Sequence, residues 1–175
     1  SDLGFGRTGK WFATDHWKVV PDLMTVAKGL TSSYLPLGAV LMRDKIAAHF
    51  EQNVFNGGLT YNSHPMSCAA AIACINVYKE DNLVENAEKV GRTLERELLK
   101  LKDKHPSVGD VRSIGLFSIV ELVKDRKTRE PLVPFNAKGD QMAVMNKLNG
   151  FFRENGLYTF VRWNNFFVNP PLCIT

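Results

Sequence analysis

Cysteine is scarce in this sequence, with three residues in 175, at positions 68, 74 and 173. An odd number without a Cys-x-x-Cys pair argues against a disulfide framework and against a zinc site. Cys68 and Cys74 stand in an alanine-rich apolar stretch, which is typical of small core residues. His16, His49 and His105 share no spacing of metal ligands. We therefore expect no bound metal and a reducing, cytoplasmic location.

Long hydrophobic runs are also absent. No apolar stretch approaches the roughly 20 residues that cross a bilayer, and Ser1-Asp2-Leu3-Gly4 lacks the basic and apolar pattern of a secretion signal. We expect no membrane partner. The hydrophobic content of 45% and the charged content of 23% are those of a globular protein and exclude a disordered tail.

Neither sign of charge dominates: 22 Lys and Arg residues against 18 Asp and Glu residues leave a net charge of +4. The most basic segment, residues 124–129, contains Asp125 and is predicted to be a turn. This pattern favours a solvated surface over a nucleic-acid-binding patch, so we expect no nucleic-acid partner.

The first part of the chain has an α/β pattern. Continuous apolar runs at Leu23–Ala27 and Leu37–Met42 predict buried strands of a sheet covered on both faces. Pro65–Tyr78 is alanine-rich and predicts a helix that begins at proline. His64, just before it, is interpreted as a capping residue rather than a catalytic one. Leu83–Lys102 carries apolar residues every three or four positions, which predicts a long amphipathic helix.

The pattern changes after Pro106. Val108–Val123 predicts strands around two glycines, and Gln141–Glu154 predicts a helix that ends at Asn155-Gly156. Tyr158–Arg162 and Phe166–Val168 predict two more strands. This order is typical of an α+β domain, so we place a boundary after the long helix and divide the chain into residues 1–104 and 105–175.

The segment Gly4–Lys10 matches two nucleotide-binding patterns, G-x-G-x-x-G through its glycines and G-x-x-x-x-G-K when Lys10 is included. A dinucleotide site needs a strand before G-x-G-x-x-G and a helix after it, yet the chain begins at the motif and no helical stripe follows. A P-loop needs Ser or Thr after its lysine, where this chain has Trp11. We interpret these glycines as a tight turn, or as a place where the backbone approaches another element closely.

Lys28 ends an apolar run and precedes Gly29. A lysine at the end of a buried strand is costly unless it has a role, because desolvation disfavours its charged form. A neutral amine can attack a carbonyl group and form a Schiff base. The alternative from position alone is a lysine whose amine reaches the surface.

Six motifs in one order carry a family resemblance. They are Gly4-Phe5-Gly6-Arg7-Thr8-Gly9-Lys10, Val20-Pro21-Asp22, Ala27-Lys28-Gly29-Leu30, Leu35-Pro36-Leu37-Gly38-Ala39-Val40, Thr60-Tyr61-Asn62-Ser63-His64-Pro65 and Asn169-Pro170-Pro171-Leu172. Together they resemble the class III, or omega, aminotransferases, which are pyridoxal-phosphate (PLP) enzymes of fold type I. The resemblance implies an α/β fold of that type. Residues 1–104 would form the C-terminal part of the large PLP-binding domain, including the connecting helix. Residues 105–175 would form most of the small α+β domain.

The resemblance implies that Lys28 is the catalytic residue. Its amine would form the Schiff base with PLP and, once freed, would move the proton between the substrate Cα and the cofactor's C4′. An amine or omega-amino acid would give its amino group to a 2-oxo acid such as pyruvate.

The resemblance also implies further site residues. Thr60 would bind the PLP phosphate, typically that of the partner subunit, and the backbone of Leu59 would assist, so the family's active site requires a homodimer. Arg162 would clamp the carboxylate of the acceptor in bidentate fashion. Trp163 would line the substrate pocket or pack a domain interface.

The family places an aspartate upstream that keeps the pyridine nitrogen protonated. Asp2 is too near Gly4 to be assigned that role. We therefore expect the chain to be the C-terminal portion of a longer enzyme and to be inactive alone. Two alternatives stay open: another PLP enzyme of the same fold, such as an aminomutase or a decarboxylase, because Lys28 would serve each of them, or a catalytically incompetent fragment.

Overall fold

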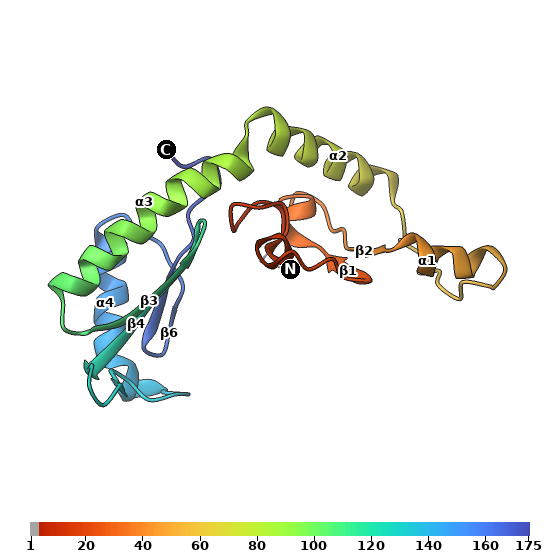
Figure 1. Cartoon of the computed structure of the whole chain (residues 1–175). Helices are drawn as coiled ribbons and strands as arrows, with labels where there is room; N and C mark the ends of the chain where they lie inside the picture. Colours follow the sequence, from red (N-terminus) through yellow and green to blue (C-terminus); the bar gives the residue numbers. More distant parts are fainter. Residues whose placement is uncertain (1–3) are drawn as a thin grey trace. The chain divides into compact units, whose positions relative to one another are not determined.

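The structure is a computed structural model that describes residues 4–175, so Asp2 lies outside the described residues. The chain forms two compact units, Ser1–Glu85 and Asn86–Thr175 (Figure 1). The predicted boundary at 104/105 lies at the other end of the long helix α3, Leu83–Lys104. The units divide earlier because Leu98 of α3 belongs to the core of the second unit. The assignment of a large and a small domain stays a prediction.

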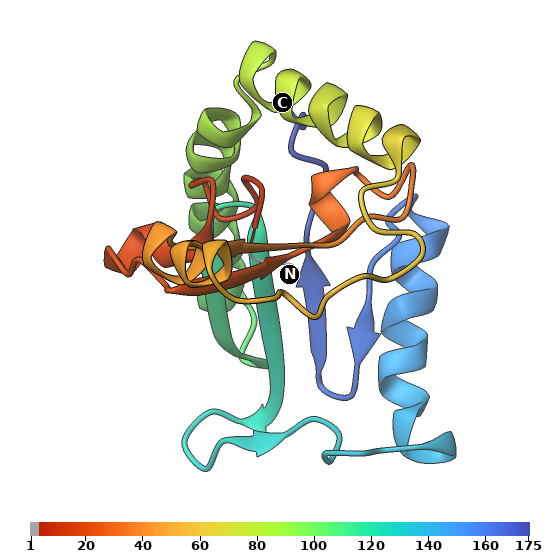
Figure 2. The ribbon, with the colours of Figure 1, turned by 90° about the vertical axis from the view of Figure 1, so that its right-hand side faces the viewer.

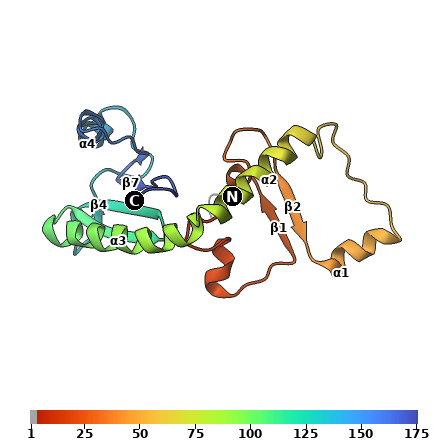
Figure 3. The same cartoon turned by 90° about the horizontal axis from the view of Figure 1, so that it is seen from above.

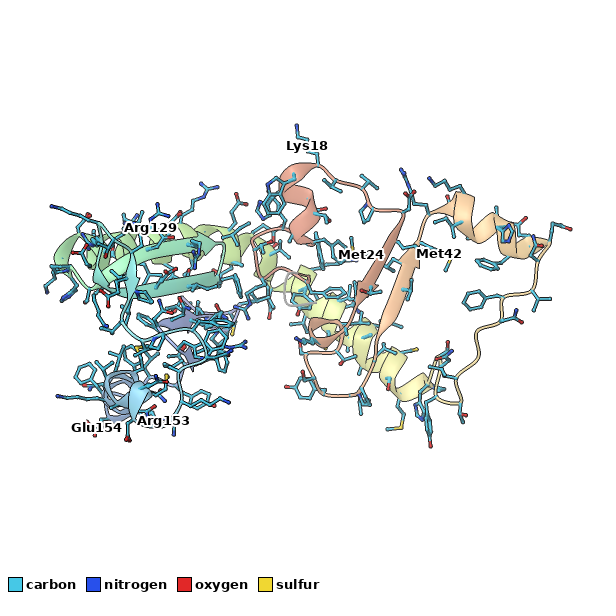
Figure 4. All side chains as sticks on the ribbon, turned by 90° about the horizontal axis from the view of Figure 1, so that it is seen from below. Lys18, Met24, Met42, Arg129, Arg153 and Glu154 are labelled. Atoms are coloured by element: carbon cyan, nitrogen blue, oxygen red, sulfur yellow. The ribbon has the colours of Figure 1, made fainter. Side chains whose placement is uncertain are left out.

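The first unit contains an antiparallel pair of strands, β1 (Leu23–Val26) and β2 (Ala39–Met42). Met24 lies opposite Leu41 in the register, and Figure 4 labels Met24 and Met42 on the two strands. The structure confirms that both segments are strands, but the expected burial is wrong. Leu23 is 55% exposed and Val40 is 56% exposed, because within the described residues this sheet has two strands and does not continue on either side.

Helical segments make up much of the rest of the first unit. The helix α2 (Pro65–Glu80) lies over the β1–β2 pair (Figure 1). His64 caps α2 through its Nδ1 atom, which accepts a hydrogen bond from the Met66 amide at 3.3 Å, and Pro65 is the first helical residue. Both sequence predictions are confirmed. The segments are η1 (Ala13–Trp17), η2 (Lys28–Leu30), α1 (Asp44–Ala47), η3 (Ala48–Glu51) and α2 (Pro65–Glu80).

The glycine-rich segment at the start of the chain is a tight turn, as predicted. The Gly9 amide donates to the Gly6 carbonyl at 2.9 Å, and the Gly6 amide donates to the Trp11 carbonyl at 3.3 Å. Both glycines have a positive φ, which explains the residue type. The five-residue 3-10 helix η1 follows, rather than the α-helix that a nucleotide site requires.

The second unit is a five-stranded antiparallel sheet with two helices. Its strand order is β3-β4-β7-β6, and β5 pairs with the C-terminal end of β4, at Val123 and Asp125. In Figure 2, α3 lies on the side of β3 and β4, and α4 lies on the side of β6 and β7. The elements are β3 (Val108–Ile114), β4 (Phe117–Asp125), β5 (Glu130–Pro131), η4 (Gly139–Met142), α4 (Ala143–Glu154), β6 (Val161–Arg162) and β7 (Asn165–Val168).

The core of the second unit joins both helices to the sheet. Leu98 of α3, Val120 of β4, Met145 of α4 and Phe166 of β7 belong to one buried cluster. This cluster confirms the predicted apolar stripe of the long helix. Among the described residues, no helix combines the length and the apolar composition that crossing a bilayer requires.

Candidate active site

Lys28 stands on a sharp turn directly after β1. It is the first residue of η2, and its backbone is left-handed, with φ of +49°. This conformation costs a lysine on the order of 1–2 kcal/mol, so surrounding contacts must hold it. The side chain is exposed. The expectation of a lysine at the end of a buried strand is therefore wrong, because β1 is itself largely exposed and ends two residues earlier, at Val26.

The residues after Lys28 anchor this turn. The Leu30 amide donates to the Ala27 carbonyl at 3.1 Å, and the Thr31 amide donates to the Lys28 carbonyl at 3.2 Å. Leu30 is 8% exposed and Thr31 is 1% exposed. The Thr31 hydroxyl also donates to the Leu35 carbonyl. The exposed lysine thus stands on a buried, hydrogen-bonded base.

Tyr78 of α2 contacts the same turn at Gly29. Its hydroxyl donates to the Gly29 carbonyl at 3.1 Å, and its ring packs against the rings of Phe5 at 6.2 Å and Trp11 at 6.0 Å between centroids. A Cβ atom at Gly29 would lie 3.2 Å from Phe5 Cβ and 3.3 Å from the Tyr78 hydroxyl. Phe5 or Tyr78 would have to shift by a few tenths of an ångström to admit a side chain at this position, because three segments approach one another closely.

Arg7 also interacts with Tyr78. Burial lowers the pKa of the Arg7 guanidinium, and the neighbouring Tyr78 partly opposes that shift. Sequence reasoning did not assign Tyr78 a role. The available signal was an aromatic residue near the end of an alanine-rich helix, which is equally typical of ordinary core packing.

Leu59 and Thr60 lie in the loop between η3 and α2, which Figure 3 shows as a long connection. Both residues are exposed, Leu59 by 78%. The Asn62 amide donates to the Leu59 carbonyl at 3.0 Å, so a turn encloses Thr60. A Cβ atom at Gly58 would meet no atom within 4 Å, which leaves space in front of this backbone. The loop therefore presents a hydroxyl group and backbone amides to an open region.

Arg162 and Trp163 lie in the second unit, where the structure brings them together. The guanidinium carbon of Arg162 is 4.2 Å from the centroid of the Trp163 ring, and the Phe135 ring packs on Trp163 at 4.4 Å. The turn is fixed to the sheet because the Asn164 side chain donates to the Leu122 carbonyl at 3.0 Å, and the Leu122 amide donates to the Asn164 carbonyl at 2.7 Å.

The predicted residues thus form three groups of different chemistry. The first unit presents a primary amine at Lys28, which can bond a carbonyl carbon, and a hydroxyl at Thr60, which suits a phosphate. The second unit presents the guanidinium of Arg162, which suits a carboxylate. Among residues 4–175, no three His, Cys, Asp or Glu side chains are grouped as metal ligands would be.

Comparison with known proteins decides the family. The sequence profile described as aminotransferase class-III matches residues 2–175. This chain belongs to the class III aminotransferases. Lys28, Thr60 and Arg162 all lie within the matched residues.

Two curated relatives of this class III chain are described as pyruvate aminotransferases. The putrescine–pyruvate aminotransferase of Pseudomonas aeruginosa is 39% identical over 173 residues, which cover 98% of this chain and 36% of the relative. The taurine–pyruvate aminotransferase of Bilophila wadsworthia is 38% identical over 160 residues, which cover 88% of this chain and 33% of the relative. The chain therefore spans about a third of the length of these relatives.

A solved structure shows the same fold. The taurine:2-oxoglutarate aminotransferase of Bifidobacterium kashiwanohense, in complex with PLP and glutamate, has a TM-score of 0.91 and 39% identity. The likeness covers 98% of this class III chain and 38% of that structure. It confirms the predicted fold class, the α/β fold type I of PLP-dependent transferases.

Proposed function

We propose that the protein containing this chain is a PLP-dependent aminotransferase in which Lys28 bonds the cofactor. The observation that carries the proposal is the geometry of Lys28, an exposed residue on a left-handed turn that is followed by the buried Leu30 and Thr31. The named relatives support it, since each is described as an aminotransferase and the solved one holds PLP.

The residues present fit this cofactor by their chemistry. PLP carries an aldehyde, which a lysine amine can bond, and a phosphate, which hydroxyl groups and backbone amides bind. Lys28 supplies the amine, and Thr60 with the Leu59 backbone supplies the phosphate contacts. The open space at Gly58 leaves room for a phosphate against this loop. When bound, PLP withdraws electrons from the substrate carbon and so allows its proton to leave.

Lys28 and Arg162 then have separate tasks. Lys28 would hold the cofactor through its amine, and the same amine would take the proton from the substrate Cα as general base. Arg162 binds the carboxylate of the acceptor, and the ring of Trp163 orients the guanidinium. Thr60 serves the cofactor of the partner subunit, so the active enzyme is a homodimer.

The proposed donor is an amine or omega-amino acid, and the proposed acceptor is a 2-oxo acid such as pyruvate. The relatives named for putrescine and taurine with pyruvate support this choice. The relative named for 2-oxoglutarate makes that acid the second acceptor to test.

The test is product analysis with the complete protein and PLP. Putrescine, taurine and an omega-amino acid are each supplied with pyruvate or 2-oxoglutarate, and alanine or glutamate is measured. We expect alanine to form with wild type and not with Lys28→Ala. Release of carbon dioxide, or a rearranged amine with no consumption of 2-oxo acid, would instead show a decarboxylase or an aminomutase. The 175-residue chain alone is expected to form no product.

A further inference from the structure

The left-handed backbone of Lys28 needs support from outside its own turn. A lysine at φ of +49° is unstable in isolation and persists where neighbours fix the chain on both sides. The buried Leu30 and Thr31 hold the C-terminal side. Between them and Lys28 stands Gly29, whose carbonyl accepts from the Ser32 amide at 3.4 Å and from the Tyr78 hydroxyl at 3.1 Å.

Tyr78 is itself held firmly. It lies in α2, a 16-residue helix, and is 7% exposed. Its ring packs against Phe5, which belongs to the glycine-rich turn, and against Trp11. The hydroxyl is therefore a fixed point to which the Gly29 carbonyl is tied, 49 residues away in sequence. Because the Ser32 amide also reaches that carbonyl, loss of the hydroxyl does not leave the carbonyl without a partner.

We propose that Tyr78 is a positioning residue for Lys28. Its hydroxyl, bonded to the Gly29 carbonyl, fixes the backbone of the turn and thereby orients the Lys28 side chain. The inference rests on the proposed function, since it concerns how Lys28 reaches the aldehyde carbon of PLP. Tyr78 touches neither cofactor nor substrate in this role. It acts through Gly29, the residue after Lys28, whose carbonyl belongs to the Gly29–Leu30 peptide bond.

The test measures bond formation at Lys28 rather than turnover. The complete protein is freed of cofactor, PLP is added, and the visible absorption band of the lysine-bound cofactor is followed in time. Tyr78→Phe keeps the stacked ring and removes the hydroxyl alone. We expect band formation to slow by about fivefold, the factor that corresponds to a typical net hydrogen-bond energy.

A matched control separates positioning from general destabilisation. Ser113→Ala in the second unit also removes one hydroxyl, which pairs with the Ser118 hydroxyl at 2.8 Å. We expect Ser113→Ala to lower the thermal midpoint of the cofactor-free protein at least as much as Tyr78→Phe, because the buried Ser118 loses its hydroxyl partner whereas the Gly29 carbonyl keeps the Ser32 amide. Only Tyr78→Phe should slow band formation. Equal slowing in the two variants would show that Tyr78 serves stability alone and would overturn the inference.

A second variant approaches the same contact from the other side. Gly29→Ala places a Cβ atom 3.3 Å from the Tyr78 hydroxyl and 3.2 Å from Phe5 Cβ, so it crowds both residues. We expect this variant also to slow band formation, and expect the slowing to be smaller in the Tyr78→Phe background, where the hydroxyl is gone. Additive effects would contradict the inference.

The two proposals fail in different ways. If wild type forms no visible band that depends on Lys28, as judged with Lys28→Ala, the proposed function fails and the positioning role fails with it. If wild type forms that band and Tyr78→Phe forms it at the same rate, only the positioning role is overturned.

Discussion

The guanidinium carbon of Arg162 lies 4.2 Å from the centroid of the Trp163 ring, although the two residues are adjacent in the chain. Neighbouring strand residues point to opposite faces. Here Trp163 leaves the strand with a left-handed φ of +50°, which turns its ring back toward Arg162. Phe135 packs on the same ring at 4.4 Å between centroids. The direction of the guanidinium is thus set by an aromatic pair.

Removal of this ring should weaken binding of the acceptor. We expect Trp163→Leu to raise the KM for the 2-oxo acid by about two- to fivefold, the loss of one exposed cation–π contact, and to leave the KM of an amine donor unchanged. Steady-state kinetics of the complete enzyme measure both. Tyr158→Leu removes the similar contact between Arg153 and Tyr158 and should change neither value. A larger effect on the donor than on the acceptor would contradict the role of Arg162.

The contact between α3 and the β3–β4 turn should tolerate no side chain at Gly91. A Cβ atom there would lie 2.4 Å from the Gly115 carbonyl carbon, and backbone cannot move aside cheaply. We expect Gly91→Ala to destabilise the second unit by about 1–3 kcal/mol. Gly150→Ala in α4 meets open space and should stabilise by about 0.5–1 kcal/mol. Urea unfolding curves test this pair, and equal shifts of the midpoint would refute the argument.

Arg126 should stabilise the end of α3. Its Nη2 atom donates to the His105 carbonyl at 2.7 Å and also to the Lys102 carbonyl, and its Nε atom donates to the Val108 carbonyl at 2.9 Å. A cation at a helix C-terminus is favourable as well. We expect Arg126→Met to cost about 1–2 kcal/mol in thermal or urea unfolding. Lys127→Met removes the same charge from the same turn and should cost little; an equal loss would assign the effect to net charge.

Much of the fold follows from local sequence patterns. The apolar repeat from Leu83 predicts α3, Pro65 after His64 predicts the start of α2, and the glycine at 115 predicts the turn between β3 and β4. These signals involve neighbouring residues, so they need no tertiary information. The two-residue strand β5 was missed because Glu130 and Pro131 carry no strand pattern.

The environment of the candidate site was less predictable. The apolar run that contains Val40 suggested burial, but exposure depends on which other segments cover a strand, and that information is not local. The left-handed backbone of Lys28 is atypical of lysine. The bond from Tyr78 to Gly29 joins residues 49 positions apart, and a single sequence contains no signal for such a pair.

The central claim is that Lys28 is the residue that bonds PLP, and the most direct test is where the cofactor becomes attached. The complete protein with PLP is treated with borohydride, digested, and searched by mass spectrometry for the modified peptide. Lys18→Ala is a matched control, because Lys18 is also exposed and also has a left-handed backbone, with φ of +54°. We expect the modification at Lys28 in wild type and in Lys18→Ala, and no modified peptide or visible band in Lys28→Ala. Modification of another lysine, with the band retained in Lys28→Ala, would contradict the account.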